Sequence, residues 1–148
     1  MEPQVRQERT GWRDQGLSLR HREWGWDCPA IDIDFLMVEY DLGNPVALVE
    51  YKNEHACEQR ISHPSYRALI QLADRAQLPL FLVRYTDDFS QWTVIPLNDH
   101  AKEKCPSNWE CSESDYVRFL YGLRGRPKYE LGTGRGEDQH DENVEIIL

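Results

Sequence analysis

Three charged residues, Asp34, Glu50 and Lys52, have the types and the spacing of a hydrolytic site. Glu50 and Lys52 end the apolar run VALVEYK, which spans residues 46–52. Side chains two apart on a β-strand point to the same face of the sheet. A buried strand rarely carries such charges, because an unpaired buried carboxylate is strongly destabilising. Two carboxylates that converge repel each other unless a proton or a cation lies between them, so the pattern indicates a cation site.

The chemistry of such a site follows from its ligands. Carboxylate oxygens suit Mg²⁺ or Mn²⁺, which keep several waters and accept a phosphate oxygen of a substrate. The Lys52 ammonium can orient a water or help to deprotonate it, and can offset charge that develops on phosphorus. Metal, water and lysine together form a site for phosphodiester hydrolysis. The simpler alternative is a surface ion pair at the end of a strand, because a Glu-x-Lys triplet alone is common.

A β-hairpin is the element that must bring Asp34 to Glu50. Residues 31–41, IDIDFLMVEYD, are rich in strand-forming types; LGNP is turn chemistry, and VALVEYK is the return strand. An odd number of loop residues, such as residues 42–44, places Asp34 opposite Lys52 with all three charges on one face. An even loop would place Asp34 and Glu50 on opposite faces.

The rest of the chain alternates helical and strand patterns. Helices are expected within residues 16–25, 63–79 and 111–127, and strands at residues 80–85 and 92–97. Ser65 is the expected cap of the second helix, and Ser112 or Ser114 that of the third. A helix between the hairpin and the next strand permits a parallel crossover. The expected fold class is therefore α/β, a mixed central sheet flanked by helices on both faces.

Charge is unevenly distributed along the 148 residues, whose net charge is −9. Residues 31–60 carry seven acids against two bases, and the last twelve residues carry five acids and no base. This charge balance argues against a protein that simply coats nucleic acid. An acidic patch can, however, be a cation site. We expect residues 1–136 to form one domain and residues 137–148 an acidic C-terminal tail.

The cysteines and the apolar runs bear on the compartment. Four cysteines match no C-x-x-C pattern and are expected to be plain thiols. The alternative is a zinc site from Cys57, Cys105, Cys111 and His55. No apolar run approaches the roughly 20 residues of a membrane span, and the polar start lacks the apolar segment of a secretory signal. The expected location is the cytoplasm.

Asp34 followed sixteen residues later by Glu50-Tyr51-Lys52, at the end of an apolar strand, resembles the PD-(D/E)xK (restriction-endonuclease-like) nuclease superfamily. The resemblance covers about residues 15–97 and is to its small phage or bacterial nucleases and Holliday-junction resolvases. It implies that Asp34 and Glu50 bind Mg²⁺ and that Lys52 serves the attacking water. The family's Pro-Asp pair is absent, which leaves the choice between Asp32 and Asp34 open. We favour Asp34, because Asp32 would lie further from Glu50.

Further residues are candidates for metal or DNA contacts. By the same resemblance, Glu23 in the first helix could add a metal ligand, although a solvated helix face also accounts for it. The candidates for nucleic-acid contact are Arg22, Gln71, Arg124, Arg126 and Lys128. Three of these follow or end the last helix, where cations also complement the helix dipole.

The function expected from these residues is that of a metal-dependent nuclease acting on DNA, with Mg²⁺ or Mn²⁺ as cofactor. Cutting both strands of a duplex would favour a homodimer. The alternative is a non-catalytic module of the same fold that binds nucleic acid or protein in a regulatory or inhibitory role. The presence of all three site residues favours the nuclease.

Overall fold

The computed structural model describes residues 15–25 and 29–125 of the chain. These residues fall into two units, one ending at Asp32 and the other beginning at Ile33. The first unit contains the predicted N-terminal helix, α2 (Gln15–Trp24). The predicted acidic tail lies outside the described residues. None of the described helices has both the length and the apolar character needed to cross a bilayer.

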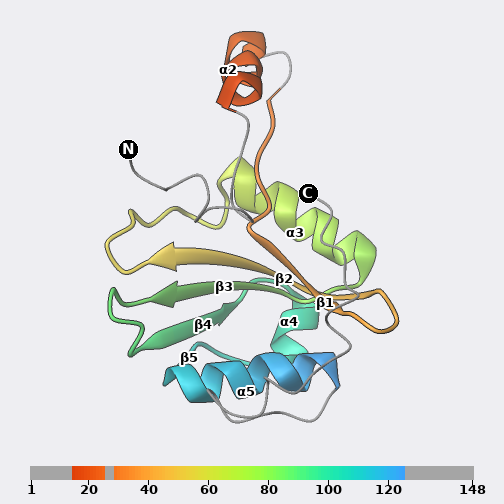
Figure 1. The fold of residues 1–148 in the computed structure, drawn as a ribbon, viewed down its shortest axis with the longest axis vertical. Helices are drawn as coiled ribbons and strands as arrows, with labels where there is room; N and C mark the ends of the chain where they lie inside the picture. The colour runs from red at the N-terminus through yellow and green to blue at the C-terminus, as the bar shows by residue number, and fades with distance from the viewer. Residues whose placement is uncertain (1–14, 26–28, 126–148) are drawn as a thin grey trace, which may run out of the picture. The chain divides into compact units, whose positions relative to one another are not determined.

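The second unit is built around a five-stranded sheet with strand order β1-β2-β3-β4-β5 (Figure 1). Its elements are β1 (Phe35–Glu39), β2 (Asn44–Asn53), α3 (Pro64–Ala76), β3 (Leu80–Tyr85), β4 (Trp92–Pro96), α4 (Asp99–Lys104), β5 (Trp109–Cys111) and α5 (Glu113–Arg124). β2 and β3 run parallel, and the other neighbouring strands run antiparallel. The α/β class with a mixed sheet is therefore confirmed. The short elements α4 and β5 were not predicted.

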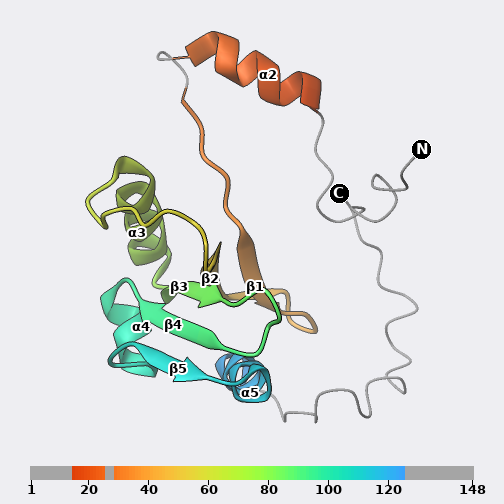
Figure 2. The same ribbon diagram turned by 90° about the vertical axis from the view of Figure 1, so that its left-hand side faces the viewer.

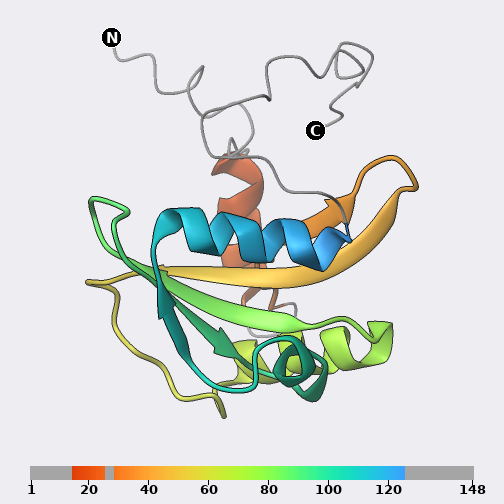
Figure 3. The same ribbon diagram turned by 90° about the horizontal axis from the view of Figure 1, so that it is seen from below.

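Helices cover both faces of the sheet, α3 on one and α5 on the other (Figures 2 and 3). Alternate residues of the central strands supply the two cores. The α3-side core consists of Leu48, Tyr66, Leu69, Ala73, Leu80, Leu82 and Leu97. The α5-side core consists of Ala47, Val49, Phe81, Val83, Trp92, Val94, Ala101, Cys105 and Tyr116. β3 is thus buried on both faces along most of its length, and β2 is buried in its middle, at residues 47–49.

The two long helices of this unit begin at identifiable caps. Ser112 caps α5, because its hydroxyl accepts a hydrogen bond from the backbone N–H of Asp115 at 3.2 Å. Ser65 was predicted to cap α3, but the cap is His63. Its Nδ1 accepts a hydrogen bond from the backbone N–H of Ser65 at 3.1 Å. Pro64 then occupies the first turn, where its missing N–H is harmless.

The hairpin turn differs from the prediction. Four residues, 40–43, lie between the paired Glu39 and Asn44, so the loop is even and not odd. In a regular ladder this loop would turn Asp34 and Glu50 to opposite faces.

A β-bulge restores the parity that the loop would have destroyed. The register shifts between the pair Val38–Pro45 and the pair Met37–Ala47, which leaves Val46 as an extra residue on β2. Beyond the bulge Phe35 pairs with Val49. Continuing this register by one residue places Asp34 opposite Glu50, and not opposite Lys52 as predicted. The two carboxylates are neighbours because of the bulge.

A single buried amide, that of Asn98, joins three elements next to the sheet. Its Oδ1 accepts from the backbone N–H groups of Leu80 at 3.0 Å and Ala101 at 2.9 Å. Its Nδ2 donates to Oδ1 of Asp74 and to the carbonyl of Leu78, each at 2.9 Å. Asn98 therefore caps α4 and holds the end of α3 against the start of β3.

We expect Asn98→Ala to lower the free energy of unfolding by about 2–4 kcal/mol, because it removes a helix cap and leaves buried groups without partners. Urea denaturation followed by circular dichroism measures the change. Asn108→Ala, at an exposed position, is the matched control and should be close to neutral. A loss below about 0.5 kcal/mol for Asn98→Ala would contradict the role given to this amide.

Candidate metal and hydrolytic site

Asp34 and Glu50 meet where β1 begins against β2. The backbone N–H of Asp34 donates to Oε2 of Glu50 at 3.0 Å, and the backbone N–H of Tyr51 donates to Oδ2 of Asp34 at 2.9 Å. Asp34 is exposed and Glu50 is half-buried. A carboxylate offers about four lone-pair positions, so it can accept a backbone hydrogen bond and also bind a cation. The sequence thus places two oxygen-donor groups side by side at a strand end.

Glu50 and Lys52 lie on the face of the sheet that α3 covers. Leu48, two residues before Glu50, belongs to the α3-side core, and the alternation of the strand carries Glu50 and Lys52 to the same face. Both residues are half-buried. The apolar part of this face therefore ends in a carboxylate followed by an ammonium, as the sequence predicted.

Arg84 is a second cation at this end of the sheet, and sequence reasoning missed it. It pairs with Lys52 across the parallel strands β2 and β3, so their side chains share a face. Its guanidinium donates to the carbonyls of Glu54 at 3.3 Å and Ala56 at 3.2 Å. Arg84 thus fixes the chain that leaves β2. The apolar run LFLVRY, whose next-to-last residue is basic, was the available signal.

Tyr66 of α3 lies within electrostatic reach of the carboxylate pair. Burial raises the pKa of its hydroxyl, and the negative charge of Glu50 raises it further, whereas the Arg84 guanidinium lowers it and Asp34 adds a smaller increase. Tyr66 is only 5% exposed and belongs to the α3-side core. It is a core residue that also brings a neutral hydroxyl towards the site.

Tyr51, between Glu50 and Lys52, anchors the strand end from the opposite face. Its hydroxyl lies 2.6 Å from that of Tyr116 on α5, and its ring meets the ring of Phe35 edge to face. Burial raises the pKa of Tyr51; the hydrogen bond to Tyr116 lowers it, and the charge of Asp34 raises it. Because Tyr51 is held in this way, the side chains on either side of it are directed towards α3.

Two of the predicted nucleic-acid contacts, Gln71 and Arg124, lie in the second unit on different helices. Gln71 lies on the exposed side of α3, where its Oε1 accepts from Arg75 at 3.4 Å. With Arg67 and Arg75 it lines an open depression. Arg124 ends α5, on the other face of the sheet, and its guanidinium lies 4.8 Å from the centre of the Tyr121 ring.

The remaining predicted residues belong to the first unit or lie outside the described residues. Arg22 and Glu23 are exposed in the last turn of α2, and Asp32 ends the same unit. Arg126 and Lys128 lie outside the described residues. Asp34, the residue favoured over Asp32, is hydrogen-bonded to β2.

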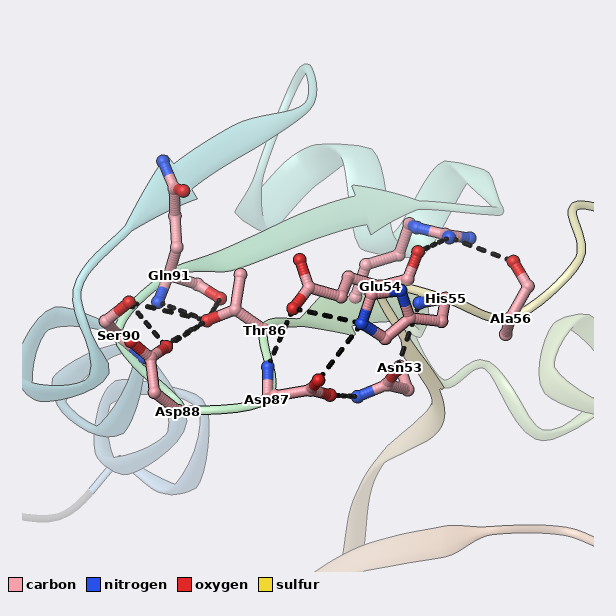
Figure 4. Close-up of polar contacts among 10 residues, drawn as sticks. Asn53, Glu54, His55, Ala56, Thr86, Asp87, Asp88, Ser90 and Gln91 are labelled. Carbon is pink, nitrogen blue, oxygen red and sulfur yellow. Dashed lines mark hydrogen bonds and ion pairs between the residues drawn. The ribbon is translucent and has the colours of Figure 1, made fainter.

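A polar cluster that the sequence did not suggest lies where β2 and β3 end (Figure 4). Nε2 of His55 lies 3.0 Å from Oδ2 of Asp87 and 3.6 Å from Oε2 of Glu54. The amide of Asn53 donates to Oδ1 of Asp87 at 2.8 Å. Hydrogen bonds from Asn53 and His55 lower the pKa of Asp87. We call the three ligand residues the Glu54–His55–Asp87 cluster.

The cysteines do not form the zinc site that was the alternative reading. Within the described part of the chain, only the Glu54–His55–Asp87 cluster brings three potential metal ligands within 4.8 Å of one another. Cys57 is an exposed free thiol, and Cys105 and Cys111 are also free. Burial raises the pKa of Cys111 to about 11 and also raises that of Cys105. These two thiols therefore stay protonated at neutral pH.

No protein-family model, curated protein or solved structure was found to match this chain. The function is therefore argued from the geometry and chemistry of the site.

Proposed function

We propose that this chain is a metal-dependent nuclease that hydrolyses DNA phosphodiester bonds at Asp34, Glu50 and Lys52. The observation that carries the proposal is the pair of hydrogen bonds that brings the two carboxylates together. The Glu50 carboxylate accepts from the backbone N–H of Asp34, and the Asp34 carboxylate accepts from the backbone N–H of Tyr51. Lys52 lies on the same face of β2 as Glu50. A structural ion pair at a strand end does not require two neighbouring carboxylates.

The donor set fits Mg²⁺ or Mn²⁺. Asp34 and Glu50 would hold the ion, because both are hard oxygen donors with access to solvent. Such a metal supplies Lewis acidity towards a phosphate oxygen and lowers the pKa of a bound water. Glu23 remains a proposed third ligand from α2.

Other residues of the chain would bind the attacking water and the phosphate, and hold the site residues in place. Lys52 would hold the attacking water and offset the charge that develops on the phosphoryl oxygens. Arg84 keeps the chain after β2 in place, and Tyr51 fixes the direction of its neighbours on the strand. Tyr66 offers a hydroxyl as a hydrogen-bond donor to a bound phosphate.

The arrangement of elements supports a restriction-endonuclease-like core. An antiparallel hairpin, a helix, and a strand parallel to the second hairpin strand follow one another in the chain. This order agrees with the resemblance of the Asp34, Glu50 and Lys52 motif. Fold alone does not establish activity, so the proposal depends on the site.

DNA is the proposed substrate, contacted through Arg22, Gln71, Arg124, Arg126 and Lys128. Gln71 has the arginines Arg67 and Arg75 beside it on α3, which adds positive charge suited to phosphates. Action on both strands of a duplex would favour two copies, and a homodimer is therefore included in the proposal. A cytoplasmic location remains a prediction.

The direct test incubates the purified chain with plasmid, linear duplex, single-stranded and four-way-junction DNA, with Mg²⁺, with Mn²⁺ and with EDTA. We expect cleavage of at least one substrate that depends on the metal. Absence of cleavage of every substrate by folded protein would contradict the nuclease. DNA binding without cleavage would favour the non-catalytic module of the same fold.

A further inference from the structure

A second set of metal-binding side chains lies on two loops that leave the parallel strands. Glu54 and His55 follow β2, and Asp87 follows β3. We propose that these residues bind a first-row transition-metal cation such as Zn²⁺, at a site distinct from the Asp34–Glu50 pair. The proposal does not depend on nuclease activity.

The spacing of the donor atoms suits a metal. Nε2 of His55 lies 3.0 Å from the Asp87 carboxylate and 3.6 Å from that of Glu54. With zinc–ligand bonds of roughly 2.0–2.2 Å, tetrahedral or octahedral geometry places neighbouring donors roughly 2.8–3.6 Å apart. An ion could therefore enter with small rotations of exposed side chains. All three residues are exposed, so solvent waters could complete the coordination.

The kind of metal follows from the donors. An imidazole nitrogen beside two carboxylates favours zinc and its neighbours, whereas magnesium and calcium prefer oxygen alone. The cluster therefore differs from the all-oxygen pair of Asp34 and Glu50. Nε2 of the imidazole faces both carboxylates. A metal would bind the Nε2 lone pair and release to solvent the Nε2 proton that donates to Asp87, with the remaining ring proton on Nδ1.

The surroundings of the cluster hold its ligands in place. Asn53 donates to the second oxygen of Asp87 at 2.8 Å and accepts from the backbone N–H of His55 at 3.0 Å. The backbone N–H of Glu54 donates to the carbonyl of Tyr85 at 2.8 Å. Such supporting hydrogen bonds orient ligands before the metal arrives.

The loop that carries Asp87 is also closed by its own hydrogen bonds. Oγ1 of Thr86 donates to Oδ1 of Asp88 at 2.9 Å, and the Ser90 hydroxyl donates to the same oxygen at 2.7 Å (Figure 4). A bound ion would join this loop to the one after β2, and would stabilise the parallel pair β2–β3 at its open end.

The test titrates the full chain with Zn²⁺ by calorimetry and with Co²⁺ by visible absorption. Wild type is expected to bind one ion. The affinity for this ion should fall about tenfold or more in His55→Ala and in Asp87→Asn. His100→Ala, on α4, is the matched histidine control and should bind as wild type does. The double variant Asp34→Asn, Glu50→Gln should also keep this Zn²⁺, which separates the two sites.

Bound Co²⁺ should show weak visible bands without the intense near-ultraviolet bands of thiolate ligands. Unchanged affinity in both His55→Ala and Asp87→Asn would overturn the proposal, and so would failure of folded wild type to bind Zn²⁺. Loss of binding in Cys57→Ser with retention in Asp87→Asn would assign the metal to a thiol, and would also overturn it. Circular dichroism melts confirm that each variant is folded.

Discussion

Replacing Lys52 by alanine is expected to lower the rate of DNA cleavage by about 10²- to 10⁴-fold while leaving metal affinity close to that of wild type. The ammonium is not a metal ligand, so its loss removes stabilisation mainly in the transition state. Lys52 lies on the same face of β2 as Glu50 and pairs with Arg84 of β3. Single-turnover cleavage at saturating Mg²⁺ and calorimetric metal titration measure the two quantities separately.

Two comparisons give this experiment its controls. Lys102→Ala removes the same charge from an exposed position in the last turn of α4, and should cleave as wild type does. Lys52→Arg keeps a positive charge with a different shape and should recover part of the rate. Cleavage by folded Lys52→Ala at the wild-type rate would remove Lys52 from the mechanism.

The strands and long helices of the second unit could be predicted because their signals are local. The hairpin, α3 and α5 follow from apolar periodicity and turn residues. The pairing of β2 with β3 followed from the helix between them. The shortest elements, α4 and β5, gave too little periodicity to be recognised.

The bulge at Val46 is the feature on which the site depends and that the sequence did not reveal. The four-residue loop alone would separate Asp34 from Glu50, and only the extra residue on β2 brings them together. Pro45, next to the bulge, was a signal, because proline cannot donate a ladder hydrogen bond and often marks irregular pairing. The parity argument predicted that Asp34 and Glu50 share a face, but it assumed a regular ladder and the wrong cross-strand partner for Asp34.

Contacts between distant parts of the chain were also beyond sequence reasoning. Asp87 is 32 residues from His55, and nothing in either local pattern indicates the other. Tyr66 fits the apolar stripe of its helix, and nothing in that pattern indicates that the same position brings it near Glu50. Such pairings depend on the parallel crossover, which sets two loops side by side after their strands end.

The double variant Asp34→Asn, Glu50→Gln is expected to abolish the stabilisation of the fold by Mg²⁺. Wild type at ~100 times its dissociation constant should gain about 2.7 kcal/mol in the free energy of unfolding. The amides keep acceptor oxygens for the backbone N–H groups of Asp34 and Tyr51, so the fold should persist without the metal. Removing two neighbouring negative charges should leave the metal-free protein at least as stable as wild type.

Mg²⁺ is the right ion for this measurement, because the imidazole of the Glu54–His55–Asp87 cluster disfavours it. Urea denaturation with and without Mg²⁺ gives the stabilisation, and Glu103→Gln, Glu110→Gln is a control with the same change of charge at exposed positions. The control should keep the full response to Mg²⁺. An equal response in the Asp34, Glu50 double variant would show that the ion binds elsewhere. This result would contradict the hydrolytic role proposed for the pair.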